Sequence, residues 1–432
     1  MGTMMRRHWI PAVLSSELQG PDAGPVRIRL LGENLIAFRD SKDRVGILDA
    51  LCPHRRAPLY FGLNENGGLT CVYHAWKFDV NGNCMQLPHL ANDPEKMSRI
   101  KTKSYPCKEV GGIVWTYMGS GGEMPEMPCF DWVDLPDDQT FMTKQLVDCN
   151  YSQAIEGDMD PFHVSILHMT TDDQRRYQSM EGNEQDYVGE PEDGVLSLEH
   201  EFRLIAADPV PEITVYRTPF GVFSGARRVA DADKSYWRMN QFILPFYAGT
   251  PWTENYAAQC NVWVPRDDVS TVVWRIHYDP RQPLREDVVE RLDSGWDAHV
   301  PASEYAEPTG EPQSEWYPKR NRSNDYGYDR KSQKEGPNSV AGIAGIWAQD
   351  RIMTEGMGPI IDRTEESLMP GDAPIIEVRK CLLKAAGALD KSADVPIEGV
   401  RYPTQACVQT AVHPNELDFA QVSEAVLAKI SA

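Results

Sequence analysis

Two short segments of the chain each carry one cysteine and one histidine. The first is CPH, with Cys52 and His54, and the second is CVYH, with Cys71 and His74. Two thiolates and two imidazoles could hold a tetrahedral zinc ion, although structural zinc sites more often space their ligands as cysteine pairs and histidine pairs. One cysteine and one histidine on each arm suit a [2Fe–2S] cluster in which the cysteines bind one iron and the histidines bind the other. The pattern therefore favours iron–sulfur chemistry.

A second group of candidate ligands lies in the segment NYSQAIEGDMDPFHVSILH, residues 150–168, where Asp160 is followed by His163 and His168. Two histidines and a carboxylate are the facial ligand set of non-haem iron(II), which leaves coordination positions open for O₂. Residues five apart on an ideal helix point about 140° away from each other. We therefore expect a kink or bulge between the two histidines, and Pro161 is a ready cause.

The segments CPHRRAPLYFG and CVYHAWKFDVNG resemble the Rieske domain of ring-hydroxylating oxygenases, and residues 150–168 resemble the catalytic domain of the same enzymes. The resemblance implies two cofactors, a Rieske [2Fe–2S] cluster and a mononuclear Fe(II). It implies cluster ligands at Cys52, His54, Cys71 and His74, and iron ligands at His163 and His168.

The sequence departs from this family at two positions of the cluster segments. Arg56 and Ala75 stand where most members have glycine. We expect both residues to be tolerated, provided that the backbone of Ala75 has a negative φ.

In this family the aspartate three residues before the first iron-ligating histidine, here Asp160, bridges to a Rieske histidine of a neighbouring subunit, by resemblance His74. Electron transfer across a subunit boundary implies a head-to-tail ring, either a homotrimer or a dimer of trimers.

The third iron ligand must be a carboxylate from a distant part of the chain. The segment GIAGIWAQDRIMTEGMGPIIDRTEESL, residues 342–368, resembles the late helix that supplies it in the phthalate-dioxygenase branch of the family. We choose Asp350, with Glu355 and Asp362 as the next candidates. Spacing alone does not decide, because each is equally explained as a solvated charge on a helix.

The chain has no strand–GxGxxG–helix unit for a dinucleotide. The resemblance therefore implies that electrons come from a separate flavin and iron–sulfur reductase. For the substrate we consider Arg227 and Arg228, because a guanidinium facing into the sheet binds an aromatic carboxylate in a bidentate manner. Alternation along a strand lets only one of the two face inwards, and a plain surface arginine remains the alternative for either.

The elements that must position these residues fall into two regions. Residues 1–140 contain short β-like runs such as Val26–Leu31, Leu35–Phe38 and Gly112–Tyr117, and they predict an all-β Rieske domain with a linker. Residues 141–432 contain a series of longer strand-like runs and then helical patterns, which predict a catalytic domain with a large antiparallel sheet flanked by helices. The fold class is therefore α+β, of the helix-grip type. The predicted strands of the second domain are Ile213–Tyr216, Phe220–Val229, Tyr236–Phe246, Tyr256–Val264 and Thr271–Tyr278; its predicted helices are Leu284–His299, Val340–Leu368, Ile376–Ala388 and Pro414–Ile430.

Composition excludes several classes of protein. The chain has 432 residues and a formal charge of −21, which argues against binding to nucleic acid or to an anionic membrane. No apolar run approaches the roughly 20 residues of a membrane span, and the first residues lack the core of a signal peptide, so we expect a cytoplasmic protein. The acidity either helps to dock the reductase or serves only solubility.

The best-supported function is a terminal oxygenase that dihydroxylates an aromatic carboxylate such as phthalate, isophthalate or a chlorobenzoate. A monooxygenase or O-demethylase of a methoxy- or phenoxybenzoate uses the same metals and is the close alternative. An iron–sulfur electron carrier or a zinc-stabilised binding protein would explain the Cys/His segments. It would give no role to Asp160, His163 and His168.

Overall fold

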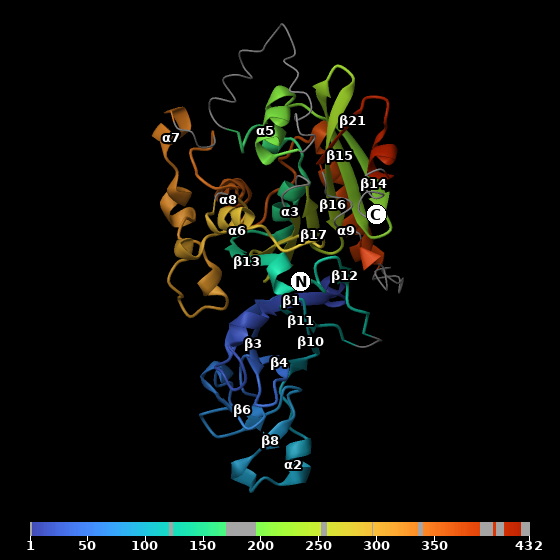
Figure 1. Ribbon diagram of the computed structural model, residues 1–432. Helices are drawn as coiled ribbons and strands as arrows, with labels where there is room; N and C mark the ends of the chain where they lie inside the picture. The colour runs from blue at the N-terminus through green and yellow to red at the C-terminus, as the bar shows by residue number, and fades with distance from the viewer. Residues whose placement is uncertain are drawn as a thin grey trace. The chain divides into compact units, whose positions relative to one another are not determined.

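A computed structural model of the chain describes residues 2–120, 124–169, 196–251, 257–295, 297–335, 340–388, 401–402 and 410–424. The chain divides into two compact units (Figure 1). The first unit comprises Met1–Cys129, Val264–Asp268 and Glu307–Glu315, and the second comprises Phe130–Trp263, Val269–Ala306 and Trp316–Ala432.

The first unit is built from short antiparallel strands. Its strands are β1 (Trp9–Leu14), β2 (Val26–Leu30), β3 (Glu33–Arg39), β4 (Val45–Asp49), β5 (Leu63–Glu65), β6 (Gly68–Thr70), β7 (Lys77–Phe78), β8 (Cys84–Gln86), β9 (Ser104–Tyr105), β10 (Cys107–Val110) and β11 (Ile113–Tyr117). Its helical turns are α1 (Thr3–Arg6), η1 (Ser15–Leu18), η2 (Leu59–Phe61), η3 (Pro88–Leu90) and α2 (Pro94–Ser98). The strands form sheets of order β1-β11-β10, β2-β3-β4-β9 and β5-β6-β7-β8.

The apolar core of this unit lies beneath the two Cys/His segments. Cys52 and Cys71 are buried in one cluster with side chains from β3, β4, β6 and β7, among them Phe38, Leu69 and Phe78. Cys71 directly follows β6, and Cys52 lies three residues after the end of β4, so that each cysteine lies next to a strand that is anchored in the core. The predicted all-β character of this region is confirmed.

The second unit contains one large antiparallel sheet. Its strands are β13 (Thr140–Val147), β14 (Glu212–Thr218), β15 (Gly221–Asp231), β16 (Lys234–Ile243), β17 (Tyr247–Thr250), β18 (Ala258–Pro265), β19 (Thr271–Tyr278) and β21 (Thr410–Pro414); β12 (Cys129–Phe130) and β20 (Arg401–Tyr402) form a separate pair. The order in the sheet is β13-β19-β18-β17-β16-β15-β14, and β21 pairs with β16. The sheet confirms the strands predicted from the alternating runs.

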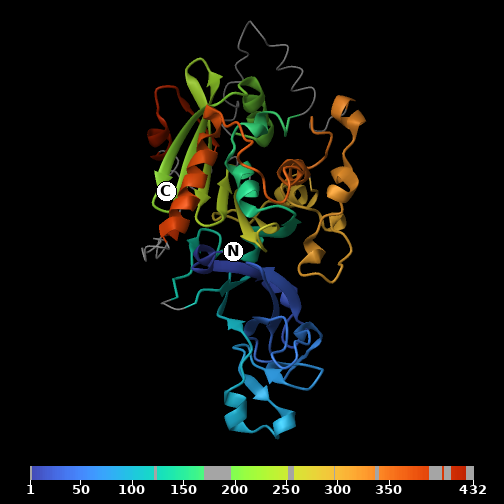
Figure 2. The same cartoon turned by 180° about the vertical axis from the view of Figure 1, so that it is seen from behind.

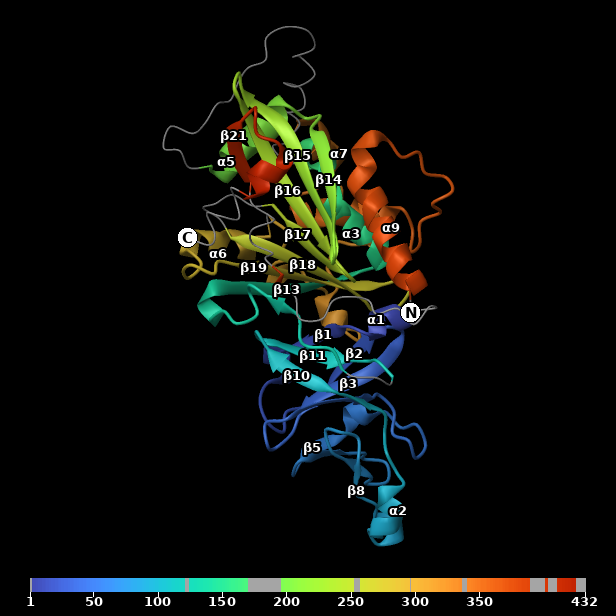
Figure 3. The ribbon, with the colours of Figure 1, turned by 90° about the vertical axis from the view of Figure 1, so that its right-hand side faces the viewer.

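Helices cover the sheet of the second unit. The helices and helical turns of this unit, of which α3, α5 and α9 contact the sheet, are η4 (Asp137–Gln139), α3 (Tyr151–Met159), η5 (His163–Ser165), α5 (Leu198–Ala207), α6 (Glu286–Asp293), η6 (Ala302–Glu304), η7 (Ser314–Trp316), η8 (Arg322–Gly327), α7 (Arg330–Glu335), α8 (Ile346–Gly356), η9 (Pro370–Asp372) and α9 (Ala373–Ala388). α3 packs against β17, α8 and α9, and α9 packs against β14 and β15. α3 and α9 therefore lie on the same side of the sheet (Figure 3), and Figure 2 shows α9 running along it. Within the described residues, no helix combines the length and the apolar character that a bilayer span requires.

Three predicted helices differ from the structure. Within the predicted range Leu284–His299 the described helix is Glu286–Asp293, and Gly295 follows it with a positive φ of 73°. Only Ile346–Gly356 is helical within the predicted range Val340–Leu368, because glycine ends the helix and Pro359 follows within the next turn. Pro414 ends strand β21 instead of beginning a helix; residues 419–424 are helical, and residues 425–432 lie outside the described part of the chain.

Candidate metal centres

The two Cys/His segments fold into matched loops. In the first loop Arg56 N donates to Cys52 O over 2.9 Å, and in the second Ala75 N donates to Cys71 O over 2.8 Å. Arg56 and Ala75 both close their loops with a positive φ, 58° and 57°. The expectation of a negative φ at Ala75 is therefore wrong, because the loop needs the left-handed conformation that glycine adopts most easily. A residue other than glycine in this region costs about 1–3 kcal/mol.

The side chains of these loops meet the requirements of a [2Fe–2S] cluster. The rings of His54 and His74 lie with centroids 4.5 Å apart, and the His54 ring stacks on Trp76. The Nδ1 atoms of both histidines are buried, and among the described residues neither has a hydrogen-bond partner. Burial raises the pKa of the Cys52 thiol to about 11. A buried nitrogen without a partner is costly unless it binds something, so these atoms fit as ligands.

A single zinc ion fits this site less well than a cluster does. The four ligands of a tetrahedral zinc lie about 3–4 Å from one another. In the described part of the chain, the one group of three or more candidate ligands whose atoms all lie within 4.8 Å of one another is His163, His168 and Asp350. The ligands at the Cys/His loops are thus spread more widely, as two iron atoms joined by sulfide would require.

The backbone break before His163 is what brings the second group together. Asn150 caps α3, since its side chain accepts a hydrogen bond from Ser152 N, and the helix ends at Met159. Asp160 then has φ −87° and ψ 106°, the extended conformation that a following proline imposes. A new 3₁₀ turn begins at His163. Instead of the expected kink, α3 ends completely at Met159, two residues before Pro161.

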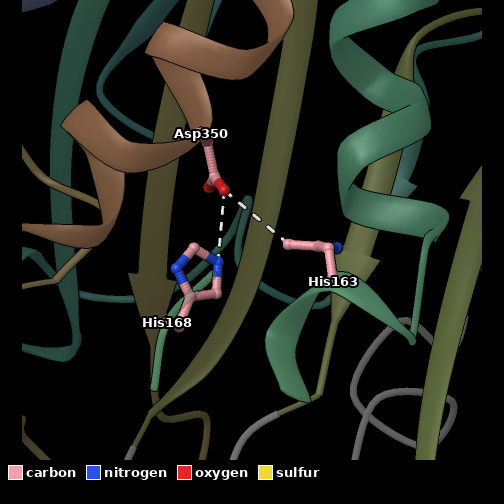
Figure 4. A group of neighbouring side chains, drawn as sticks. All are labelled: His163, His168 and Asp350. Carbon is pink, nitrogen blue, oxygen red and sulfur yellow. Dashed lines mark ion pairs between the residues drawn. The ribbon is translucent and has the colours of Figure 1, made fainter. Parts of the chain in front are cut away.

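His163, His168 and Asp350 point toward one another (Figure 4). Asp350 Oδ1 lies 3.2 Å from Nε2 of His168 and 3.7 Å from Nε2 of His163. Behind the rings, Nδ1 of His168 is hydrogen-bonded to Gln349 Oε1 at 2.7 Å. Nδ1 of His163 lies 3.4 Å from Asp160 Oδ2 as an ion pair and has no hydrogen bond among the described residues. Both Nε2 atoms therefore face the point at which a metal would be bound.

The neighbours of Asp350 and Asp160 favour the ionised form of both carboxylates. Burial alone would raise the pKa of Asp350, but His168 and His163 lower it below its ordinary value. Burial would likewise raise the pKa of Asp160, but His163 and the backbone amides of Phe162 and His163 lower it. The carboxylate oxygens therefore stay available as metal ligands or acceptors.

The other two carboxylates considered for the third ligand lie elsewhere. Glu355 is fully buried and accepts hydrogen bonds from Asp148 N and Tyr326 OH. Asp362 accepts hydrogen bonds from the backbone and side chain of Thr364. Neither belongs to the group of His163 and His168.

The two arginines predicted to bind substrate point to opposite faces of the sheet, as alternation requires. Arg227 donates to Ser235 Oγ and Asn415 O. Arg228 is buried, and its Nη2 donates to Pro161 O over 2.9 Å and to Ser165 Oγ over 3.0 Å. Neither is among the described residues that line the cavity beside the histidines. Arg228 instead holds the turn that carries His163.

We expect Arg228→Met to weaken iron binding at the histidine group roughly tenfold, because two hydrogen bonds that fix the turn are lost. Arg227→Met, one residue away on the other face, is the matched control and should leave iron binding unchanged. Competition with a chelator measures the affinity. Equal affinities of the two variants would contradict this role for Arg228.

A cavity that opens to solvent adjoins the three convergent side chains; the space of about 770 Å³ free of protein atoms there includes open solvent. Its lining combines apolar residues such as Val164, Phe202 and Ile346 with two guanidinium groups, the buried Arg275 and the partly buried Arg238. Arg238 pairs with Glu201, and burial lowers the pKa of Arg238 to about 10. No pattern in the sequence distinguishes these arginines, since strand alternation alone does not show which face borders a cavity.

Asp158 also lines this cavity and lies beside Arg275. Arg275 Nη1 lies 3.7 Å from the Asp158 carboxylate, which also accepts hydrogen bonds from Asn261 and Trp263. Burial raises the pKa of Asp158 to about 6, although these partners oppose the shift.

Both regions of the chain match known protein families. Residues 8–106 match the Rieske [2Fe-2S] domain, and residues 116–429 match the family described as LigXa C-terminal domain like. The chain belongs to the Rieske oxygenases. This Rieske oxygenase is 35% identical to the 3-chlorobenzoate-3,4-dioxygenase oxygenase subunit of Comamonas testosteroni, over 92% of this chain and 87% of that protein. It is 32% identical to the phthalate 4,5-dioxygenase oxygenase subunit of Pseudomonas putida, over 97% of this chain and 90% of that protein.

Solved structures support the same fold. Dicamba monooxygenase bound to dicamba matches this Rieske oxygenase with a TM-score of 0.55 and 16% identity, over 90% of this chain and 100% of that chain. The predicted family, fold class and enzyme class are confirmed, and so are the two cofactors, a [2Fe–2S] cluster and a mononuclear non-haem iron.

Proposed function

We propose that this chain is the terminal oxygenase component that hydroxylates an aromatic carboxylate, with electrons from a separate flavin and iron–sulfur reductase. The observation that carries the proposal is the convergence of His163, His168 and Asp350 at the edge of a cavity that also contains arginine side chains. Bound there, iron(II) would supply open coordination positions for O₂.

The substrate class follows from the cavity together with the relatives. An arginine presents five N–H donors in a fixed plane, which matches a carboxylate. Arg238 uses Nη1 to pair with Glu201, and within the described part of the chain no other hydrogen bond of its guanidinium is seen, so the remaining N–H groups are the candidate donors to a ligand. The two relatives that cover most of the chain are named for chlorobenzoate and phthalate, which are both aromatic carboxylates.

In this proposal the Rieske domain and its linker comprise residues 1–140, and the catalytic domain comprises residues 141–432. The cluster is held by Cys52, His54, Cys71 and His74. Asp160 accepts a hydrogen bond from His74 of a neighbouring subunit while its carboxylate orients His163. Exposed apolar side chains next to each partner support such docking, since Tyr73 is 54% exposed and Phe162 is 36% exposed. The assembly is a head-to-tail homotrimer or a dimer of trimers.

O-demethylation is the second candidate reaction, and a different relative supports it. The 5,5'-dehydrodivanillate O-demethylase oxygenase subunit of Sphingobium is 35% identical over 39% of this chain. The same iron site serves both reactions, and the placement of the ring or of a methoxy group above the iron selects between them.

The test supplies the purified protein and a surrogate reductase with phthalates, chlorobenzoates and methoxybenzoates. A cis-diol product supports dihydroxylation, and formaldehyde with a phenol supports O-demethylation. Iron and acid-labile sulfide are measured on the same sample, and zinc without sulfide would overturn both outcomes.

We expect Arg238→Met to raise KM for a carboxylated arene by about 10–100-fold, which corresponds to the roughly 1.5–3 kcal/mol of a hydrogen bond to a charged group. The KM for the neutral amide of the same arene should change little. Steady-state kinetics with both compounds measures the difference. Equal increases for the acid and the amide would show that the variant only disturbs the cavity.

A further inference from the structure

One buried amide lies directly behind an iron-ligating histidine. Gln349 precedes Asp350 on α8 and is 5% exposed. Its Oε1 lies 2.7 Å from Nδ1 of His168, and its Nε2 donates to Ile343 O over 2.8 Å. The side chain therefore joins the turn before α8 to the His168 ring.

The contact with Ile343 determines which end of the amide faces His168. A backbone carbonyl can only accept a hydrogen bond, so the NH₂ group must face Ile343. The carbonyl oxygen of Gln349 then faces His168, and it too can only accept. Nδ1 of His168 must therefore carry the ring proton, which leaves the lone pair of the neutral ring on Nε2, the atom that faces Asp350.

The two histidines of the site are held by partners of different charge. His163 has the carboxylate of Asp160 behind it at 3.4 Å, whereas His168 has the neutral amide of Gln349. A carboxylate makes an imidazole more basic and adds a negative charge to the site, while an amide orients the ring without adding charge.

We propose that Gln349 is a positioning residue for the mononuclear iron: it holds His168 in the tautomer that binds through Nε2 and keeps that side of the site neutral. The inference rests on the proposed function, in which His168 is an iron ligand. A purely structural alternative is that Gln349 only ties α8 to Ile343.

Two variants of similar size separate these roles. Gln349→Met removes both the acceptor and the donor. Gln349→Glu loses the amide donor but keeps an oxygen that accepts from His168. Both therefore lose the amide contact with Ile343, and only the glutamate retains the contact with His168.

We expect Gln349→Met to weaken Fe(II) binding about 10–100-fold, and Gln349→Glu to stay close to the wild type. The glutamate should also shift the reduction potential of the mononuclear iron to a more negative value, because it adds charge behind a ligand. Chelator competition gives the affinity and a redox titration gives the potential. Equal losses of affinity in both variants, or a potential that does not move, would overturn the proposal.

Gln153 provides a matched control. It is also a buried glutamine, and its Nε2 donates to Thr354 O and Gly358 O at the other end of α8. Gln153→Met should lower thermal stability without changing iron affinity. If the wild type itself binds no iron beyond the cluster, the proposed function fails. If the wild type binds iron and Gln349→Met binds it equally well, only this inference fails.

Discussion

Replacing Asp350 by alanine is expected to remove the mononuclear iron while the Rieske cluster remains. Asp350 is the one carboxylate in the described group of three ligands. Structural zinc sites of four ligands contribute about 10–16 kcal/mol, or about 3 kcal/mol for each ligand, and by this measure the loss of Asp350 lowers iron affinity roughly 100-fold. At stoichiometric iron, occupancy and oxygenase activity should both collapse.

The control for this experiment is Asp362→Ala. Asp362 is a competing candidate for the same role, and the hydrogen bonds described for its carboxylate come only from Thr364. The measurement is iron per chain, with the visible absorbance of the cluster as an internal standard for folded protein. Retained iron in Asp350→Ala together with lost iron in Asp362→Ala would reverse the assignment of the third ligand.

Asp160→Asn is expected to leave iron in place and to slow electron transfer from the cluster by about 10–100-fold. Asp160 Oδ1 accepts hydrogen bonds from Phe162 N over 2.8 Å and from His163 N over 3.4 Å. An asparagine oxygen accepts the same bonds, so the turn before His163 should persist. The variant loses the negative charge beside His163, and in the proposed assembly it replaces by an NH₂ group the second oxygen that would accept from His74 of a neighbouring subunit.

The rate at which the reduced cluster is reoxidised in a single turnover, with substrate and O₂ present, measures this effect. Iron content must be equal in the variant and the wild type for the comparison to hold. A wild-type rate in Asp160→Asn would contradict the bridging role. Loss of iron would instead show that Asp160 acts mainly by orienting His163.

The sequence by itself determined the features that depend on neighbouring residues. The pairing of one cysteine and one histidine at Cys52 and Cys71, and the end of α3 before Pro161, are local features. The backbone of a few neighbouring residues determines their geometry. The strand-like runs of β15, β16 and β19 likewise predicted the sheet. The structure buries both faces of β19, since all eight of its residues are buried. The left-handed conformation of Ala75 was missed, because loop closure overrode the preference of alanine.

Only the tertiary structure decided which distant groups meet. Asp350 and His168 lie far apart in the chain, and the packing of α8 against α3 brings their elements together and leaves Glu355 and Asp362 outside the group. The same packing places Gln349 behind His168. It also places Arg238, and not Arg228, in the lining of the cavity where a carboxylate would bind. Spacing along a chain restricts local geometry, whereas the partner of a buried polar group is set by long-range packing, which a single sequence does not reveal.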